Sequence, residues 1–402
     1  MNSLPFPLSK KQLFVTVVLA LAVIGGVVYG VTKLRASIEL SNLDPFGKTQ
    51  ADTSDPENLL NQPSSTTSAD EKKTTVSSST TPAKTPAKTP TKAPAPSTPA
   101  PSTPALPAPP APAPPPQTSG CNGAAWSPDG PDPWGGCWPG PNTTGIPNGA
   151  VLSAYTGSCN ITTAGTVIDS KTVNCILSIN APNVTISRSQ INGGVDVPTT
   201  APGSASFAIS DSNIHVGDNL NTGLMRRNFT ATRVDITGGR RSVYCVSNCT
   251  VTDSWVHAQG GDPDGQAHFS GMRMEQYSTF RHNSITCEAT RVPGSGCSAG
   301  LTGYGDFAPI QNNLIERNLF YRGGGGGSTA CAYGGSSGSD GSKPYGNQAM
   351  NIRFIGNRFV KNSDNGLCGN LRTIIDFDRN RPGNEWSDNL YHDGAVVGSN
   401  GP

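Results

Sequence analysis

The chain has few charged residues, and neither sign is in clear excess. Its 402 residues include 29 Lys and Arg and 28 Asp and Glu, for a formal net charge of +1. Basic patches interleaved with aromatic residues are also missing, which argues against nucleic acid as a partner. No stretch of the C-terminal part follows a sustained helical period. We therefore expect residues 119–402 to form one all-β domain.

Cysteine is absent before Cys121, and all ten cysteines lie at or after that position. No Cys-x-x-Cys pair and no histidine at ligand spacing accompany them, so a zinc site is the weaker alternative. An even number confined to one region predicts disulfides and an oxidising compartment. Sequence alone leaves the connectivity open, but the simplest pairing joins neighbours: Cys121–Cys137, Cys159–Cys175, Cys245–Cys249, Cys287–Cys297 and Cys331–Cys368.

Residues 13–31 form an uncharged apolar run, long enough for a transmembrane helix. Lys10 and Lys11 precede it while Lys33 and Arg35 follow closely, so the positive charges do not orient it. The predicted disulfides orient the segment instead, because they place the C-terminal domain outside the cell and the N-terminus inside. We expect residues 1–36 to be a cytoplasmic tip and an uncleaved signal anchor; a cleaved signal peptide is the alternative.

Residues 37–118 are rich in Ser, Thr, Pro, Ala and Lys and nearly free of large apolar side chains. Such a segment cannot bury enough surface to offset its chain entropy. Its proline-dense part, residues 82–116, favours extended polyproline II and could reach roughly 100 Å. This composition predicts a disordered stalk between membrane and domain.

A short motif recurs through the C-terminal domain, most clearly in residues 183–192. Two apolar residues at alternate positions, Val184 and Ile186, are followed by a polar slot, Ser189, and by Ile191. Later copies place asparagine in the slot: Asn283, Asn318, Asn357 and Asn389. Repeats of this length indicate a solenoid. The shorter copies hold three strands rather than the four of a propeller blade, so the pattern predicts a parallel β-helix with stacked slot asparagines.

Residues 119–149 precede the repeats and contain Trp126, Trp134 and Trp138 among Pro and Gly. Solenoid ends must be covered, because an open coil exposes its core and strand edges. We expect this segment to be an N-terminal cap over the first coil. Sugar stacking by the tryptophans is the alternative.

Several runs resemble secreted bacterial right-handed parallel β-helix proteins of the pectate-lyase-like superfamily: residues 137–145, 166–170, 184–189, 305–307, 343–345 and 376–378. The resemblance covers nearly all of the C-terminal domain and implies its fold. It leaves the chemistry open, since the superfamily includes lyases, hydrolases, epimerases and non-catalytic adhesins. Many relatives have His-x-Asp-Gly where this chain has His268-Phe-Ser270-Gly271, so one carboxylate is missing.

Counting back from the slot asparagines aligns residues 270–274, 299–305 and 372–378 as one column of strands, which residues 329–334 join. Long loops fall between the same coils, as a binding groove requires. The candidate site residues on and beside this column are Asp262, Asp264, His268, Arg273, Asp306, Tyr333, Asp376, Asp378 and Arg379.

Two reaction types fit these residue types. A lyase needs a cation and a base, which Ca²⁺ on Asp262 and Asp264 with Arg273 or Arg379 would supply. A hydrolase needs two carboxylates, and Asp306 and Asp376 are the candidates. His268 and Asp378 are further catalytic candidates, and Tyr333 and Arg379 would bind substrate. The alternatives are structural: Asp262-Pro-Asp264-Gly is a common turn, and Asp376 and Asp378 alternate as on any solvated strand face.

The sequence thus predicts a membrane-anchored cell-surface domain that acts on or binds polysaccharide. Its partners would be a glycan and the membrane, and Ca²⁺ is the cofactor that the pattern suggests. A non-catalytic adhesin or glycan-binding module is the alternative function.

Overall fold

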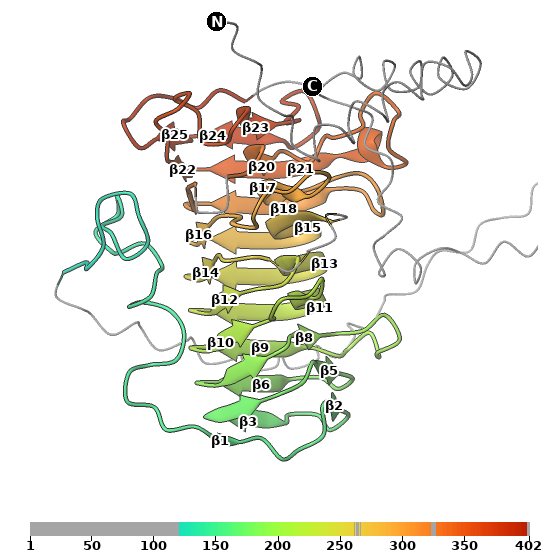
Figure 1. Cartoon of the computed structure of the whole chain (residues 1–402). Coiled ribbons are helices and arrows are strands. Elements are labelled where there is room, and N and C mark those ends of the chain that lie inside the picture. The colour runs from blue at the N-terminus through green and yellow to red at the C-terminus, as the bar shows by residue number, and fades with distance from the viewer. Residues whose placement is uncertain (1–119, 261, 263–264, 266, 323–326, 400–402) are drawn as a thin grey trace, which may run out of the picture.

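The computed structural model describes residues 120–260, 262, 265, 267–322 and 327–399 (Figure 1). These residues form short parallel strands, and their only helical element is the 3-10 turn η1 (Gly346–Gln348). The structure confirms the predicted all-β domain of stacked parallel strands, as a parallel β-helix requires. The predicted membrane helix at 13–31 and the stalk at 37–118 lie outside the described residues, within which no helix is long and apolar enough to cross a membrane.

The strands stack in three columns, which run from β1 at one end to β25 at the other (Figure 1). Column A contains β2 (Asn160–Ile161), β5 (Leu177–Ile179), β8 (Val195–Asp196), the first parts of β11 (Thr222–Thr232), β13 (Arg241–Thr252) and β15 (His268–Arg281), then β17 (Gly296–Thr302), β20 (Ala330–Tyr333) and β23 (Arg372–Ile375).

Column B contains β3 (Val167–Asp169), β6 (Val184–Ser187), β9 (Phe207–Ser210), the second parts of β11, β13 and β15, then β18 (Gln311–Glu316), β21 (Met350–Ile355) and β24 (Glu385–Ser387). Column C contains β1 (Ser153–Ala154), β4 (Lys171–Val173), β7 (Gln190–Asn192), β10 (Asn213–His215), β12 (Asp235–Thr237), β14 (Trp255–Val256), β16 (Ser284–Ile285), β19 (Leu319–Phe320), β22 (Arg358–Phe359) and β25 (Leu390–Tyr391). Each coil of the solenoid therefore supplies one rung to each column.

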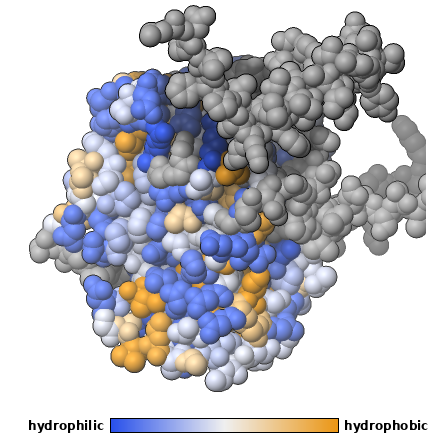
Figure 2. Space-filling view, in the orientation of Figure 1, coloured by the Kyte–Doolittle hydropathy of each residue, from blue (hydrophilic) through white to orange (hydrophobic). Residues whose placement is uncertain are grey.

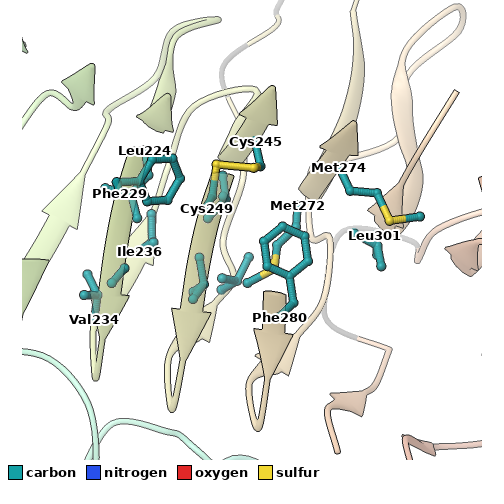
Figure 3. Packing of buried hydrophobic residues seen from close by; sticks show 14 of the residues in the cluster. Leu224, Phe229, Val234, Ile236, Cys245, Cys249, Met272, Met274, Phe280 and Leu301 are labelled. Atoms are coloured by element: carbon teal, nitrogen blue, oxygen red, sulfur yellow. A yellow bond between two sulfur atoms is a disulfide. The ribbon is translucent and has the colours of Figure 1, made fainter. Parts of the chain in front are cut away.

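Alternation of apolar and polar residues places the core inside the three columns. In β6, Val184 and Ile186 are buried while Thr185 between them is exposed. Ile186 pairs with Ile209 of β9, so identical positions of successive coils stack on one another. Figure 3 shows this packing further along, where Leu224, Phe229, Met272 and Phe280 fill the interior. The apolar positions of the repeat are thus the core positions of the solenoid.

The predicted asparagine ladder is confirmed at the corner between columns B and C. The side chain of Asn283 donates to Oδ1 of Asn318 at 3.0 Å, Asn318 donates to Asn357 at 3.0 Å, and Asn357 donates to Asn389 at 2.9 Å. All four are buried. Each amide also bonds to backbone groups of neighbouring coils, as when Asn318 donates to the carbonyl of Phe280. The ladder therefore satisfies corner groups that the strands leave unpaired.

The five disulfides join neighbouring cysteines, as the simplest pairing predicted: Cys121–Cys137, Cys159–Cys175, Cys245–Cys249, Cys287–Cys297 and Cys331–Cys368. Cys245 and Cys249 lie in the core, on either side of the bend at which β13 passes from column A to column B (Figure 3). Their bridge takes the place of apolar side chains in that coil.

Residues 120–149 differ from the expected cap over the first coil. The N–H of Gly145 donates to the carbonyl of Arg233, and the N–H of Ile146 donates to Asn213. Trp134 lies 5.1 Å from the guanidinium of Arg317, many coils from β1. The segment therefore packs along the flank of the stack, at the corner between columns B and C, and Figure 1 shows it in teal beside the strands. We call it the flank segment.

Candidate functional site

The predicted column of strands on one face is confirmed as the end of column A. Ser270 of β15 pairs with Ala299 of β17, which pairs with Ala330 of β20, which pairs with Arg372 of β23. Met272 and Met274 point into the core. Arg273 lies between them and therefore points outward, because side chains alternate along a strand.

Arg273 is enclosed by three aromatic rings. Its guanidinium carbon lies 5.1 Å from the ring centre of Tyr244, 5.4 Å from that of Tyr304 and 4.9 Å from that of Phe307. Arg273 is 3% exposed, and its Nε and Nη2 have no hydrogen-bond partner among the described residues. Aromatic faces attract a cation but do not accept its hydrogen bonds as oxygen does. We call these three rings the aromatic box. It encloses a buried cation, two of whose nitrogens lack hydrogen-bond partners.

Two carboxylates and a second cation adjoin the box. Nη2 of Arg273 lies 3.5 Å from Glu275 and 3.9 Å from Asp306. Nζ of Lys343 lies 2.6 Å from the other oxygen of Asp306, and the hydroxyl of Tyr244 donates to Glu275 at 2.6 Å. Asp306 lies in the loop between β17 and β18 and contacts both Arg273 and Lys343.

The protonation states follow from these contacts. Burial alone would lower the pKa of Arg273, but Tyr244, Glu275 and Asp306 outweigh it and the pKa is raised. Arg273 consequently stays charged, which does not suit the base that the lyase hypothesis asks of it. Burial raises the pKa of both Tyr304 and Tyr333, whose rings meet edge to face at 4.9 Å. Both tyrosines are therefore neutral hydroxyls at physiological pH.

Asp376 follows β23 and lies two strand steps from the coil of Asp306, as expected from the sequence. Two steps correspond to roughly 10 Å between backbones. Asp376 accepts a hydrogen bond of 2.5 Å from the hydroxyl of Ser337. Asp306, Tyr333 and Asp376 thus lie along the same end of column A as Arg273, but both carboxylates are already engaged.

The other candidates lie apart from this cluster. His268 is exposed at the start of β15. Asp378 accepts from the N–H of Asn380 at 2.9 Å and lies 3.3 Å from Arg381, which makes it a turn residue. Arg379 is exposed and donates to Ser399. The structure gives these three residues no common ligand position.

The proposed Ca²⁺ ligands form no cluster that the structure describes. Asp264 lies outside the described residues. Asp262 accepts a hydrogen bond of 2.5 Å from the N–H of Ala267, which supports the turn interpretation for this residue. Among the described residues, no three His, Cys, Asp or Glu side chains are placed to hold a metal ion. The calcium site remains a prediction.

Sequence reasoning missed Tyr244, Glu275 and Tyr304 as members of the cluster. Nothing local marks them, because they meet only through strand register and loop packing. Phe307 and Lys343 did carry a signal, since both lie in runs that support the family resemblance. Their meeting through Asp306 joins those two runs in space.

A separate pocket of about 270 Å³ lies at the C-terminal end of the solenoid. Its lining is mixed: Leu371, Tyr391 and Val396 lie beside the polar Arg372 and Thr373. It holds no cluster of titratable groups like that around Arg273, so we place the candidate site at Arg273.

No family model, curated protein or solved structure matches this chain in comparisons with known proteins. The fold and the five disulfides therefore define its class: a disulfide-bonded parallel β-helix with a polar cluster on one outer face.

Proposed function

We propose that this chain is a cell-surface β-helix protein that binds a polysaccharide on the outer face of column A, around Arg273. The observation that carries the proposal is the aromatic box, in which Nε and Nη2 of a buried guanidinium lack hydrogen-bond partners among the described residues, although Nη2 forms ion pairs with Glu275 and Asp306. Buried polar groups are almost always hydrogen-bonded, so an exception marks a candidate ligand position. Sugar hydroxyl or carboxylate oxygens are acceptors of the type that a guanidinium binds.

The surroundings of the box support a polymer as ligand. Phe307, Asp306 and Lys343 line one side of it on loops rather than on strands, as binding residues commonly do. Parallel strands of successive coils repeat at about 4.8 Å, so the face extends along the stack. The part of the surface that grey atoms leave uncovered in Figure 2 is largely hydrophilic, with its hydrophobic residues in separate groups. A face that extends along the stack suits a long polymer.

The topology belongs to the same proposal. Residues 13–31 anchor the chain in a membrane, and residues 37–118 carry the domain away from it on the outer side. The five disulfides support this placement, because they persist in oxidising compartments. The resemblance to bacterial right-handed β-helix proteins of the pectate-lyase-like superfamily supports both the location and the ligand class.

The geometry favours binding over turnover. A glycosidase needs one carboxyl group free to donate a proton and another free to act as nucleophile or base. Here Asp306 contacts two cations, and Asp376 accepts from Ser337. Glycoside hydrolysis is nevertheless the second candidate, because the two-coil separation of these carboxylates approaches the roughly 6.5–9.5 Å of inverting enzymes.

The deciding experiment incubates the full-length chain with four soluble polymers: polygalacturonate, alginate, xylan and mixed-linkage β-glucan. Retardation in native gels containing each polymer measures binding, while reducing ends and unsaturated products measure turnover. We expect retardation by at least one polymer and no product. Phe307→Ala and Lys343→Ala should abolish the retardation, and Asp378→Asn, outside the cluster, should keep it.

Other results would replace the proposal. Reducing ends that disappear in both Asp306→Asn and Asp376→Asn would establish a hydrolase. Unsaturated product that disappears on chelation and in Asp264→Ala would establish a lyase with the predicted metal. Neither retardation nor product with any polymer would contradict a polysaccharide function.

A further inference from the structure

A second asparagine column lies outside the core, at the bend between columns A and B. Strand register aligns five residues there: Asn228, Asn248, Tyr277, Asn312 and Asn351. All five have left-handed backbones, with φ between 52° for Asn351 and 58° for Asn248 and Asn312. Asparagine adopts this conformation readily, because its short amide bonds locally. A bulky side chain such as tyrosine does not.

Tyr277 interrupts the ladder of hydrogen-bonded asparagine side chains that otherwise forms at this bend. The side-chain amide of Asn248 donates to Asn228 at 3.0 Å, and that of Asn351 donates to Asn312 at 2.7 Å. An asparagine at position 277 would lie between the two pairs. The chain instead keeps a strained residue that cannot continue the ladder. Strain of this kind persists at sites where the side chain has another use.

The ring of Tyr277 contributes nothing visible to folding. It is 57% exposed, and within the described residues it makes no aromatic contact and no hydrogen bond. Its immediate neighbours across the strands are amides: Asn248 and Asn312 in its own column, and the paired Gln276 and Gln311 beside it. A lone ring among amides differs from a protein interface, whose centre is usually a larger apolar group.

We propose that Tyr277 is a stacking platform for a sugar ring of the bound polysaccharide. A pyranose presents an apolar face of C–H groups and a rim of hydroxyls. The tyrosine ring offers an apolar face to the first, and amides of Gln276, Gln311 and the neighbouring asparagines can bond the second. Tyr277 follows Arg273 by four residues on the same strand, β15, so one chain could reach both. This inference rests on the proposed function.

The test exploits the conflict between folding and binding at this position. Tyr277→Asn restores the residue that the bend prefers, so we expect Tm of the full-length chain to rise by about 2–4 °C. Retardation in gels containing the polymer that binds the wild-type chain should fall at least tenfold. Tyr277→Phe keeps the ring and should retain both the wild-type Tm and the retardation. Leu371→Asn, which removes another exposed apolar side chain, should leave retardation unchanged.

The possible outcomes distinguish a failure of the stacking role of Tyr277 from a failure of the proposed polysaccharide binding. Equal retardation of the wild-type chain and of Tyr277→Asn would overturn the role of Tyr277 and leave polysaccharide binding intact. No retardation of the wild-type chain by any of the four polymers would overturn both. Loss of binding accompanied by a fall in Tm would show that Tyr277 supports the fold, and would also overturn the stacking role.

Discussion

Nε2 of His282 lies 3.1 Å from Oδ2 of Asp132, although 150 residues separate them in the sequence. Nδ1 of the same ring lies 2.7 Å from Asp253, and the indole of Trp138 stacks on it at 5.5 Å. His282 thus fastens the flank segment to the corner of the solenoid. The disulfide of that segment, Cys121–Cys137, closes within the segment itself, so the attachment depends on these non-covalent contacts.

The first prediction concerns pH. Burial alone would lower the pKa of His282, but hydrogen bonds to Asp132 and Asp253 raise it to about 9. The folded pKa lies above the unfolded value near 6.5, so the stabilisation is fully present below about pH 6.5. It is lost as the pH rises through 9, and the difference corresponds to at most about 3 kcal/mol.

Urea unfolding of the full-length chain between pH 6 and pH 10 measures this effect. His282→Gln should flatten the decline and lower stability mainly at the acid end of the range. A variant whose free energy of unfolding follows pH as the wild-type chain does would contradict the role of His282.

The second prediction concerns the buried ladder. Asn318→Ala removes the acceptor of the N–H of Asn283 and the donor to the carbonyl of Phe280, both inside the corner. Buried groups that lose their partners are costly, so the free energy of unfolding should fall by about 2–4 kcal/mol. Asn192→Ala, which breaks an exposed amide pair with Asn174, is the matched control. It should change stability by less than about 0.5 kcal/mol.

The third prediction concerns the charges of the candidate site. Lys343 and Asp306 are 11% and 14% exposed, whereas Arg353 and Glu385 form a similar pair at 45% each. Asp306→Asn leaves Lys343 and Arg273 without their shared counter-ion, and should cost about 2–4 kcal/mol. Glu385→Gln should cost less than about 1 kcal/mol. Equal effects in urea unfolding would show that the site is more solvated than its contacts indicate.

The fourth prediction concerns the disulfides. Cys331–Cys368 closes 37 residues of sequence, and Cys245–Cys249 closes only 4. Loop-closure entropy assigns about 4 kcal/mol to the first bridge and about 2 kcal/mol to the second. Thermal unfolding of the two double alanine variants compares them, and the larger loss of Tm should belong to Cys331→Ala with Cys368→Ala. The reverse order would indicate that packing in the core outweighs chain entropy.

Much of the fold could be predicted from the sequence, because a solenoid repeats local information. Val184, Ile186 and Ser189 encode one coil, and every later copy encodes its neighbour in the same register. The slot asparagines predicted their own ladder for this reason. They also located the strands around Arg273, since a fixed offset in the chain becomes a fixed column in space.

Tertiary structure alone decided what is not periodic. Asp132 and His282 meet because the flank segment folds back along the stack, and no repeat records that contact. The aromatic box depends on loops, so the sequence showed Arg273 as a candidate base while its surroundings hold it as a cation. Tyr277 depends on both the sequence pattern and the tertiary structure. Nothing in the sequence around it marks the position. Only its register with Asn248 and Asn312 shows that it occupies a position where the fold favours asparagine. Local pattern set the stack, and long-range packing set the chemistry on its surface.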